Sequence, residues 1–350
     1  MREGSSRREF LAALAGLGAS AMLPASLAAA RTFGPRRIDT HHHFFPPDYL
    51  EPLAAWNKRE GVAPGLQKPQ QDWSPAQAIE MMDQSGVATG VLSISTPGVW
   101  IGDEAQARHL ARMCNDYGAG MVRDHPGHFG LFAAMPMPSV DGTLAEIAYA
   151  LDTLGADGIG FMTSYGDLWP GDARFAPIFA ELDRRKAVAY FHPTDPNCCD
   201  KLIPGVPAAL IEYPHDTSRA ILSMLVSGTF ARYRNIRFLF SHAGASIPVL
   251  AGRIANGLKA RKDLAEIAPE GVLGEFKRLY YDTANSANPP TMAALLQLVP
   301  ATQVVFGSDF PYVAIAQNVE GFEQLRLSAK ARHAIQRGNA ERLLPRLKQA

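Results

Sequence analysis

The chain has 350 residues, of which 47% are hydrophobic and 19% are charged, and its formal net charge is zero. This composition is that of an ordinary globular protein, and it provides no basic surface for nucleic acid or for an acidic membrane. Two charge-free stretches, 84–102 and 283–308, are long enough to span a bilayer, but Gly, Pro and many polar residues interrupt both. We therefore predict no transmembrane helix in the mature chain.

The first thirty residues have the pattern of an export signal. Residues 6–11 read Ser-Arg-Arg-Glu-Phe-Leu, a weakly hydrophobic stretch follows from 12 to 23, and three alanines at 28–30 offer a cleavage site. The alternative is a membrane anchor, which the short, Ala/Gly-rich stretch disfavours. We expect residues 1–30 to be a twin-arginine signal peptide, residues 31–350 to form the mature domain, and the protein to be periplasmic or exported.

After this leader, short apolar segments alternate with helical segments. Ser74-Pro75, for example, is a good N-cap and first helical residue. Eight alternating units predict an α/β fold, a closed parallel (β/α)8 TIM barrel. The alternative, an open doubly wound sheet, lacks its usual Gly-rich phosphate loop here. The predicted strands are 37–42, 90–95, 130–135, 157–162, 187–192, 236–241, 279–283 and 303–308, and the predicted helices are 75–85, 103–123, 142–154, 173–186, 216–230, 247–260, 290–298 and 321–343.

Two long insertions, 44–74 and 193–215, follow the first and fifth predicted strands and are candidate lids or interfaces. The chain has three cysteines, an odd and sparse set that is no disulfide framework. We interpret the adjacent Cys198 and Cys199 as loop thiols, with metal ligands or a vicinal disulfide as the alternatives.

Several predicted strands end on residues with metal-ligand chemistry. His41 and His43 share one face of the first strand, because side chains alternate with a period of two. His192 ends the fifth strand and Asp309 follows the eighth. The C-terminal ends of parallel barrel strands lie on the same side, so these residues should converge. Three imidazoles and one carboxylate predict a metal site with a position open for water or substrate.

His242 follows the sixth strand and is interpreted as a nearby acid/base, because a neutral imidazole can accept a proton. Asp282, at the end of the seventh strand, either orients a ligand or caps the strand. His125 and His128 precede the third strand, which places them at the opposite end of the barrel. The candidate aromatic contacts to substrate are Phe161, Tyr165, Trp169 and Tyr312.

These motifs resemble those of the amidohydrolase superfamily, and within it the branch of metal-dependent, non-oxidative decarboxylases similar to aminocarboxymuconate semialdehyde decarboxylase and 6-methylsalicylate decarboxylase. They occur in family order over nearly the whole mature chain. They are Asp39-Thr40-His41-His42-His43-Phe44-Phe45-Pro46, Phe191-His192-Pro193, Ser241-His242-Ala243-Gly244, Tyr280-Tyr281-Asp282-Thr283-Ala284 and Gly307-Ser308-Asp309-Phe310-Pro311.

The resemblance implies that His41, His43, His192 and Asp309 hold one divalent metal, zinc in preference to manganese, and that His242 activates water or moves a proton. Binuclear members of the superfamily use a carboxylated lysine at the end of strand four. No lysine occurs between positions 123 and 186 here, so we expect a mononuclear site.

The resemblance also implies a homodimer. Relatives carry an arginine on the helix after strand six that reaches the substrate carboxylate of a neighbouring subunit, and Arg253 matches it. A guanidinium suits that task because it binds a carboxylate through two parallel hydrogen bonds. The alternative is an arginine on the helix surface. The expected catalytic residues are thus His242, Asp309 and Arg253.

The expected activity is release of CO2 from an aromatic or muconate-type carboxylic acid, with 6-methylsalicylate or a related hydroxybenzoate favoured. The same mononuclear site would also serve a hydrolase or hydratase of a lactone or unsaturated acid, because fold and ligands do not by themselves separate these reactions. A metal-loaded binding protein without catalysis is a further alternative, which the complete set of ligand and acid/base residues disfavours.

Overall fold

The computed structural model describes residues 37–61, 65–199 and 202–349. Within these ranges, no helix has both the length and the apolar character that a bilayer crossing requires. The predicted signal peptide, with its boundary at residue 30, lies outside the described residues.

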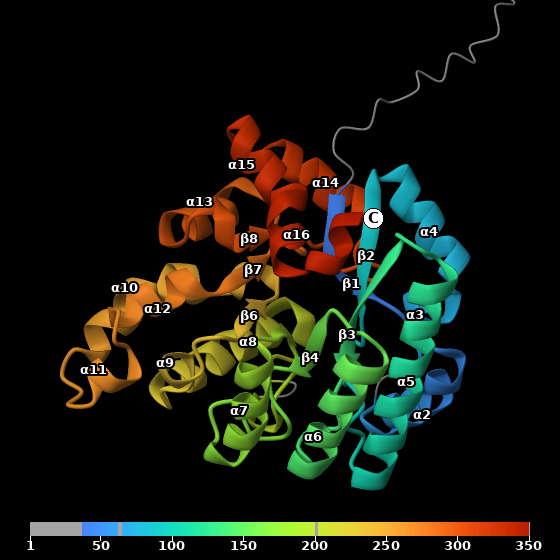
Figure 1. The fold of residues 1–350 in the computed structure, drawn as a ribbon, viewed down its shortest axis with the longest axis horizontal. Helices are drawn as coiled ribbons and strands as arrows, with labels where there is room; N and C mark the ends of the chain where they lie inside the picture. Colours follow the sequence, from blue (N-terminus) through green and yellow to red (C-terminus); the bar gives the residue numbers. More distant parts are fainter. Residues whose placement is uncertain (1–36, 62–64, 200–201, 350) are drawn as a thin grey trace, which may run out of the picture. The chain divides into compact units, whose positions relative to one another are not determined.

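Eight parallel strands form one barrel in which each strand pairs with the next in chain order (Figure 1). The barrel closes between the last strand and the first, where the Thr40 amide donates to the Phe306 carbonyl (2.9 Å) and the His43 amide donates to the Phe310 carbonyl (2.8 Å). The predicted TIM barrel is therefore confirmed. The strands are β1 Arg37–His43, β2 Val87–Ser93, β3 Phe129–Ala134, β4 Gly158–Met162, β5 Val188–His192, β6 Arg237–Phe240, β7 Tyr280–Asp282 and β8 Val304–Val305.

Helices cover the outside of this barrel, and most lie where the sequence predicts them. At the start of α4, the Ser74 hydroxyl accepts from the Gln77 amide (3.2 Å), as expected for an N-cap. The helices are α2 Pro47–Arg59, α3 Lys68–Asp72, α4 Pro75–Gln84, α5 Glu104–Asp124, α6 Val140–Ala148, α7 Ala176–Arg185, α8 Ala208–Val226, α9 Thr229–Arg232, α10 Ile247–Leu258, α11 Leu264–Ile267, α12 Gly271–Arg278, α13 Pro289–Leu298, α14 Ile315–Glu323, α15 Ala329–His333 and α16 Asn339–Leu343.

Two helix predictions were wrong. The helix predicted to begin at 216 begins at Ala208, because Pro207 takes the N-cap position and the helix continues through Pro214 in its interior. The single helix predicted over 321–343 is divided into the end of α14, then α15 and α16. The first error matters for the site, since it moves part of the second insertion into a helix that borders the cavity.

The interpretation of Cys198 and Cys199 as loop thiols is also wrong, because the structure joins them as a disulfide within a short 3-10 turn, Asn197–Cys199. The residue pattern did not reveal this turn, which brings the two side chains together.

The C-terminal segment closes the N-terminal end of the barrel. Inward-facing residues of the strands, among them Ile38, Val91 and Leu239, form one apolar cluster with Leu343 and Leu347. In Figure 1 the segment lies beside β1 and β8. This end of the barrel is therefore filled with packed side chains, and the opposite end remains for ligands, as in other TIM barrels.

The first insertion forms α2 and α3 and packs its aromatic residues, among them Phe44, Phe45 and Tyr49, into a buried cluster with apolar residues of α4 and α5. The hydroxyl of Tyr49 donates to the Gly98 carbonyl (2.5 Å), in the loop after β2. The insertion is thus fixed to the rim of the barrel.

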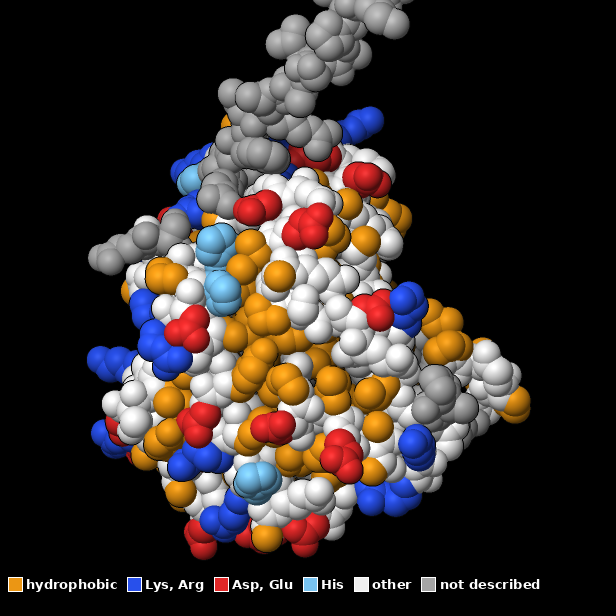
Figure 2. Space-filling model, turned by 90° about the vertical axis from the view of Figure 1, so that its right-hand side faces the viewer, with side chains coloured by type: hydrophobic (Ala, Val, Ile, Leu, Met, Phe, Trp, Pro, Cys, Tyr) orange, Lys and Arg blue, Asp and Glu red, His pale blue; other side chains and the backbone are white. Residues whose placement is uncertain are grey.

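Hydrophobic side chains also gather on the side of the barrel where α2 to α5 lie (Figure 2). An open groove of about 750 Å³ runs along α4 and reaches His125. Both His125 and His128 contact the ring of Phe129 at the start of β3. This groove therefore lies at the N-terminal end of the strands, as predicted for these two histidines. It is lined by Ser74, Pro75, Ala76, Ile79, Glu80, Asp83, Gln84 and His125.

Candidate metal centre

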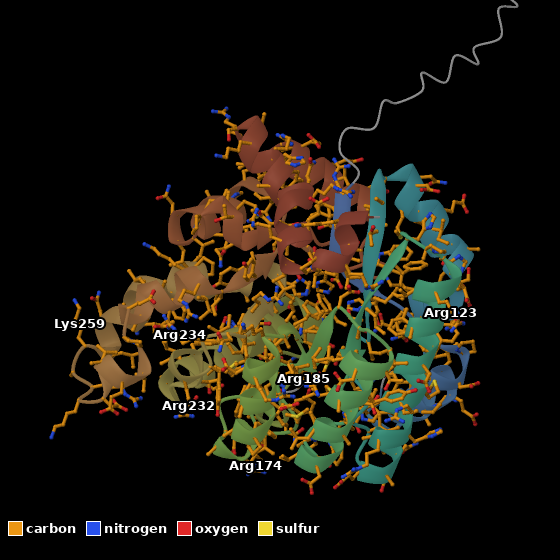
Figure 3. All side chains as sticks on the ribbon, in the orientation of Figure 1. Arg123, Arg174, Arg185, Arg232, Arg234 and Lys259 are labelled. Atoms are coloured by element: carbon orange, nitrogen blue, oxygen red, sulfur yellow. A yellow bond between two sulfur atoms is a disulfide. The ribbon has the colours of Figure 1, made fainter. Side chains whose placement is uncertain are left out.

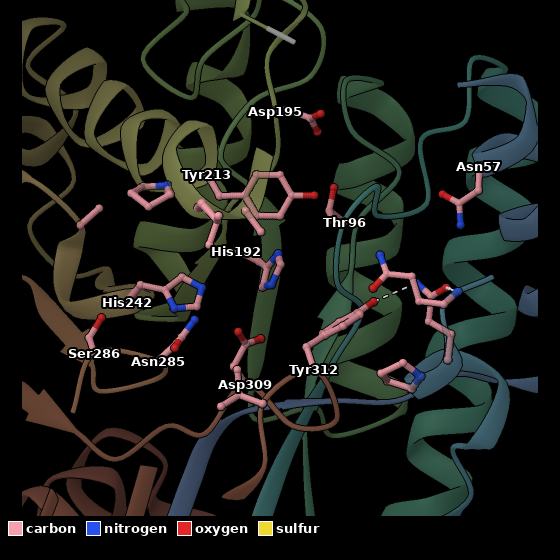
Figure 4. Close-up of a pocket in the computed structure, with 18 of the residues that line it drawn as sticks. Asn57, Thr96, His192, Asp195, Tyr213, His242, Asn285, Ser286, Asp309 and Tyr312 are labelled. Atoms are coloured by element: carbon pink, nitrogen blue, oxygen red, sulfur yellow. Dashed lines mark hydrogen bonds between the residues drawn. The ribbon is translucent and has the colours of Figure 1, made fainter. Parts of the chain in front are cut away.

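Five side chains converge at the C-terminal end of the barrel. His41, His192, His242 and Asp309 each offer a ligand atom, and these atoms lie within 4.8 Å of one another. Figure 4 shows the last three around the floor of a cavity. Nε2 of His43 lies 3.1 Å from Nε2 of His41 and 3.2 Å from Oδ1 of Asp309. The structure therefore brings together every residue predicted as a ligand and also His242.

All four imidazoles are oriented in the same way. In each ring, Nδ1 lies within hydrogen-bond distance of an oxygen that can only accept. The pairs are His41 with Asp282 Oδ2 (2.9 Å), His43 with the Ser93 carbonyl (3.1 Å), His192 with the Pro193 carbonyl (2.8 Å) and His242 with the Ala284 carbonyl (2.9 Å). Nδ1 therefore carries a proton in each case, and Nε2 is the atom left to bind a metal or a second proton.

This donor set fits a divalent metal. Two Nε2 lone pairs of His41 and His43, only 3.1 Å apart, repel each other unless a positive charge lies against them. The Asp309 carboxylate, 3.3 Å from His41 Nε2, adds a third ligand of the kind that zinc and manganese accept. His192 provides a further imidazole from β5.

The electrostatic environment agrees with this assignment. Burial lowers the pKa of His43 and holds the pKa of His192 well below its usual range, which favours the neutral form that metal binding requires. Burial would also raise the pKa of Asp309, but the nearby imidazoles hold it well below its usual range. Burial opposes charge on His41, yet the carboxylates of Asp282 and Asp309 raise its pKa to about 10. The site therefore favours a positive charge at His41.

Two buried carboxylates outside the predicted ligand set hold the site in shape. Asp282 accepts from His41 and also from the backbone amide of His242 (2.9 Å). Asp39 accepts from the backbone amides of His41 (3.1 Å) and Ser308 (2.9 Å). Asp39 therefore ties β1 to the segment that carries Asp309, and Asp282 ties a ligand to the predicted acid/base.

Two site residues have a left-handed backbone. His242 has φ of 52° and Asp309 has φ of 68°, a region that non-glycine residues rarely adopt. The neighbouring Gly244, with φ of 70°, packs so closely that a Cβ there would lie 2.5 Å from the Tyr281 ring. Tight turns after β6 and β8 thus aim both side chains at the cavity.

An open cavity of about 780 Å³ lies above the five residues. Its walls come from the two insertions and from the loops after β7 and β8, and they are mostly uncharged. Tyr312 is held there by Gln70 Nε2 and Ser95 Oγ, each 2.9 Å from its hydroxyl. Of the four aromatic candidates, Tyr312 alone lines this cavity. Phe161 and Tyr165 are buried in the core, and the Trp169 indole donates to Asp216 (2.7 Å).

Among the described residues that line the cavity there is no lysine or arginine. Arg253 is exposed on α10 and does not reach the site of its own chain. The labelled basic side chains of Figure 3 lie on or beside outer helices; they are Arg123, Arg174, Arg185, Arg232, Arg234 and Lys259.

A sequence model of the amidohydrolase family matches residues 38–346. The chain belongs to the amidohydrolase family. It is 35% identical over 329 residues to decarboxylase macB of Penicillium terrestre, covering 89% of this chain and 96% of that protein. It is also 35% identical over 319 residues to the 6-methylsalicylic acid decarboxylase of Penicillium expansum, covering 89% of this chain and 97% of that protein.

The fold of this amidohydrolase is shared by solved structures. A dihydroxybenzoic acid decarboxylase from a Polaromonas species, with bound manganese and the inhibitor 2-nitroresorcinol, aligns with a TM-score of 0.76 at 24% identity, over 88% of this chain and 96% of that one. The predicted superfamily and its decarboxylase branch are therefore confirmed. Sequence reasoning gave no role to Asp39, although its place two residues before the His-x-His pair, in the motif Asp39-Thr40-His41, was the available signal.

Proposed function

We propose that this amidohydrolase is a metal-dependent, non-oxidative decarboxylase of a hydroxybenzoate, with 6-methylsalicylate or a close analogue as substrate. The observation that carries the proposal is the convergence of four imidazoles and one carboxylate beneath a largely uncharged cavity. Identity of 35% to the 6-methylsalicylic acid decarboxylase, over nearly the full length of both chains, supports the choice of substrate class.

In this proposal His41, His43, His192 and Asp309 would hold the metal, which would supply positive charge to stabilise the negative charge of the substrate. His242 is the acid/base, because it is half-buried and lines the cavity while its Nδ1 proton is held by the Ala284 carbonyl; its Nε2 takes a proton from solvent and then delivers it. It protonates the ring carbon that bears the carboxylate. The carbon–carbon bond then breaks, its electrons restore the aromatic ring, and the carboxylate leaves as CO2.

The experiment is to supply the purified chain with hydroxybenzoates, including 6-methylsalicylate, and with aromatic lactones, and to measure CO2 release and ring opening. We expect CO2 and the decarboxylated phenol. The variant His242→Ala should keep its metal while turnover falls by roughly 10²–10⁴. Ring opening of a lactone without CO2 release would replace the decarboxylase with a hydrolase on the same site.

We infer that the resident metal is zinc. Three imidazoles and one carboxylate form a usual zinc donor set, whereas manganese prefers more oxygen ligands. The manganese-bound Polaromonas decarboxylase makes manganese the alternative to test. Metal analysis of the purified chain, followed by reloading of the metal-free chain with either ion, decides between them.

We also propose that the protein is a homodimer. On α10, Val249 (76% exposed) and Leu250 present apolar surface beside Arg253, since residues three and four apart share a helix face. Leu210, at the start of α8, is 69% exposed and also lines the mouth of the cavity. Covering this apolar face with a second copy would bring a guanidinium to a cavity that has none of its own among the described residues.

Finally, we propose that residues 1–30 direct export through the twin-arginine pathway and that residues 31–350 form the mature enzyme. The support is the Arg7-Arg8 pair followed by a short Ala-rich stretch. The test is N-terminal sequencing of the protein recovered from the periplasm, compared with a variant in which both arginines are replaced by lysine.

A further inference from the structure

We propose that Cys198 and Cys199 form a reversible disulfide that controls substrate binding at the neighbouring cavity and is reduced by dithiols. The inference rests on the proposed function only for its choice of substrate. The segment from β5 to the cysteine pair passes directly over the cavity, and Asp195 and Asn197 line it. Asn197 begins the short turn that contains both cysteines.

The disulfide is not needed as a structural staple. Cross-linking stabilises a fold mainly by restricting the unfolded chain, and the effect grows with the length of the closed loop. Cys198 and Cys199 are neighbours in sequence, so this loop is the shortest that a disulfide can close. A bond with so little structural benefit, at the rim of an active site, indicates a regulatory role.

The two sulfur atoms have different surroundings. Cys198 is exposed to solvent, whereas Cys199 is half-buried and lies against Arg219 of α8. Nη2 of Arg219 donates to Sγ of Cys199 (3.5 Å), and its Nη1 is buried with no hydrogen-bond partner among the described residues. A guanidinium in this position stabilises a thiolate. Cys199 is therefore the better leaving group and Cys198 the sulfur that an incoming thiol can reach.

The chemistry follows from this asymmetry. One thiolate of a dithiol attacks Sγ of Cys198, the disulfide breaks, and Cys199 leaves as a thiolate beside Arg219. The second thiolate of the reductant then attacks the mixed disulfide and releases Cys198. Two electrons pass from the dithiol, which becomes a cyclic disulfide, and its two protons end on the two cysteines.

The cysteine pair is coupled to the cavity through the segment between them. At its beginning, the Thr194 amide donates to the Thr163 hydroxyl (3.1 Å), and the Thr194 hydroxyl lies 2.9 Å from the hydroxyl of Thr96, which also lines the cavity. At its other end, the Cys198 amide donates to Asp167 (3.2 Å). Reduction removes the covalent restraint at the cysteine end of the segment, whereas the hydrogen bonds of Thr194 remain at the other end. Asp195 and Asn197 should then lose their fixed positions, and substrate should bind more weakly.

The test compares the full-length mature chain, metal-loaded, before and after treatment with dithiothreitol and removal of the reductant. Alkylation followed by mass spectrometry should find two new thiols at Cys198 and Cys199 while Cys114, which is fully buried, stays unmodified. The KM for 6-methylsalicylate should rise by about 5-fold or more, the lower range of coupling between sites, with less change in kcat. Oxidised glutathione should restore the starting value.

Two variants serve as controls. The double variant Cys198→Ser/Cys199→Ser should have the KM of the reduced protein and should not respond to either reagent. Arg219→Gln should slow reduction. Metal content is measured in both redox states, because thiol reductants also bind zinc.

An unchanged KM with a fully reduced pair would overturn the proposal, as would a pair that cannot be reduced in the folded protein. If no acid is turned over in either state, the proposed function fails, and calorimetric binding of salicylate to both states still decides the redox proposal. Equal salicylate affinity in the two states counts against it. By linkage, saturating salicylate should also shift the thiol–disulfide equilibrium toward the oxidised form.

Discussion

At the scale of single residues, Asp282 connects a predicted metal ligand to the proposed acid/base. Its two carboxylate oxygens reach a predicted metal ligand, His41, and the backbone of the proposed acid/base, His242. It also accepts from the Ala284 amide (3.0 Å), whose own carbonyl holds the ring of His242. One buried carboxylate therefore sets both the tautomer of a ligand and the position of the proton donor.

We expect Asp282→Asn to lower metal affinity by about 10–100-fold, the usual effect of removing a carboxylate partner from a ligating histidine. An amide keeps the volume but allows the opposite tautomer at His41. Metal affinity is measured by competition with a chromogenic chelator.

Asp263→Asn is a matched control, since Asp263 pairs with Arg261 on the surface (2.8 Å) and has no contact with the site. An affinity of Asp282→Asn equal to that of the control would show that the hydrogen bond to His41 has no role in ligation.

The ligand residues were accessible to sequence reasoning, and so was Asp282 as a candidate to orient a ligand, whereas the supporting role of Asp39 was not. His41, His43, His192 and Asp309 stand at predicted strand ends, and a parallel barrel brings such ends together without further information. Asp39 acquires its role only because the backbone of Ser308 arrives beside it when β8 closes on β1. Such a contact depends on the angle of a turn, which residue types alone do not determine.

At the scale of secondary-structure elements, α5 is attached to the end of β3 by one side chain. Asn115 donates from Nδ2 to the Ala134 carbonyl (2.9 Å) and accepts at Oδ1 from the Ala134 amide (2.7 Å). It also donates to Glu146 of α6 (2.8 Å), which pairs with Arg112. The fully buried side-chain amide of Asn115 thus takes the place of a neighbouring strand, because it pairs with both backbone groups of Ala134 at the end of β3.

Asn115→Ala should lower the free energy of unfolding by about 3 kcal/mol, because it leaves buried backbone groups of Ala134 without partners, each at a cost of roughly 1–3 kcal/mol. Urea unfolding followed by circular dichroism measures the change. The control Gln106→Ala, on the exposed face of α5, should change the free energy of unfolding by less than about 0.5 kcal/mol.

The elements themselves were largely predictable. All eight strands lie within a few residues of their predicted positions, since apolar runs bounded by turn residues are a strong signal. The start of α8 was missed because Pro204, Pro207 and Pro214 together suggested a loop. A proline at the N-cap, such as Pro207, is compatible with a helix, whereas α8 continues through Pro214 at an interior position where proline usually ends or kinks a helix.

At the scale of the whole molecule, the proposed dimer predicts complementation between two damaged sites. His242→Ala lacks the acid/base in its own cavity, and Arg253→Ala lacks the arginine offered to its partner. Equal mixing, with subunit exchange, should restore up to about a quarter of wild-type activity, because half of the dimers are mixed and one of their two sites is complete. CO2 release measures the recovery. No recovery despite proven subunit exchange would place Arg253 outside the site.

The apolar face of α10 that carries Val249 and Leu250 also predicts the association state of the protein. Val249→Asp adds a charge to an apolar surface and should convert the dimer to a monomer in analytical ultracentrifugation. Ala105→Asp, at the exposed start of α5, adds the same charge elsewhere and should leave the dimer intact. A native chain that sediments as a monomer at micromolar concentration would contradict the dimer directly.

Removal of the metal should destabilise the whole barrel, since its ligands come from β1, β5 and the loop after β8. A ligand that binds only the folded state contributes about 4 kcal/mol at a free concentration a thousandfold above Kd. Calorimetry should therefore show a lower Tm after chelation, restored by added metal. In His192→Ala the Tm should respond much less to chelation.

The left-handed backbone at His242 and Asp309 has a consequence for engineering. Each such residue costs roughly 1–2 kcal/mol relative to glycine, which adopts this conformation freely. A screen for heat resistance in metal-free medium would therefore select His242→Gly or Asp309→Gly, and the most heat-resistant variants would have lost catalytic activity. Any programme to make this catalyst more durable has to select for turnover and thermal survival together.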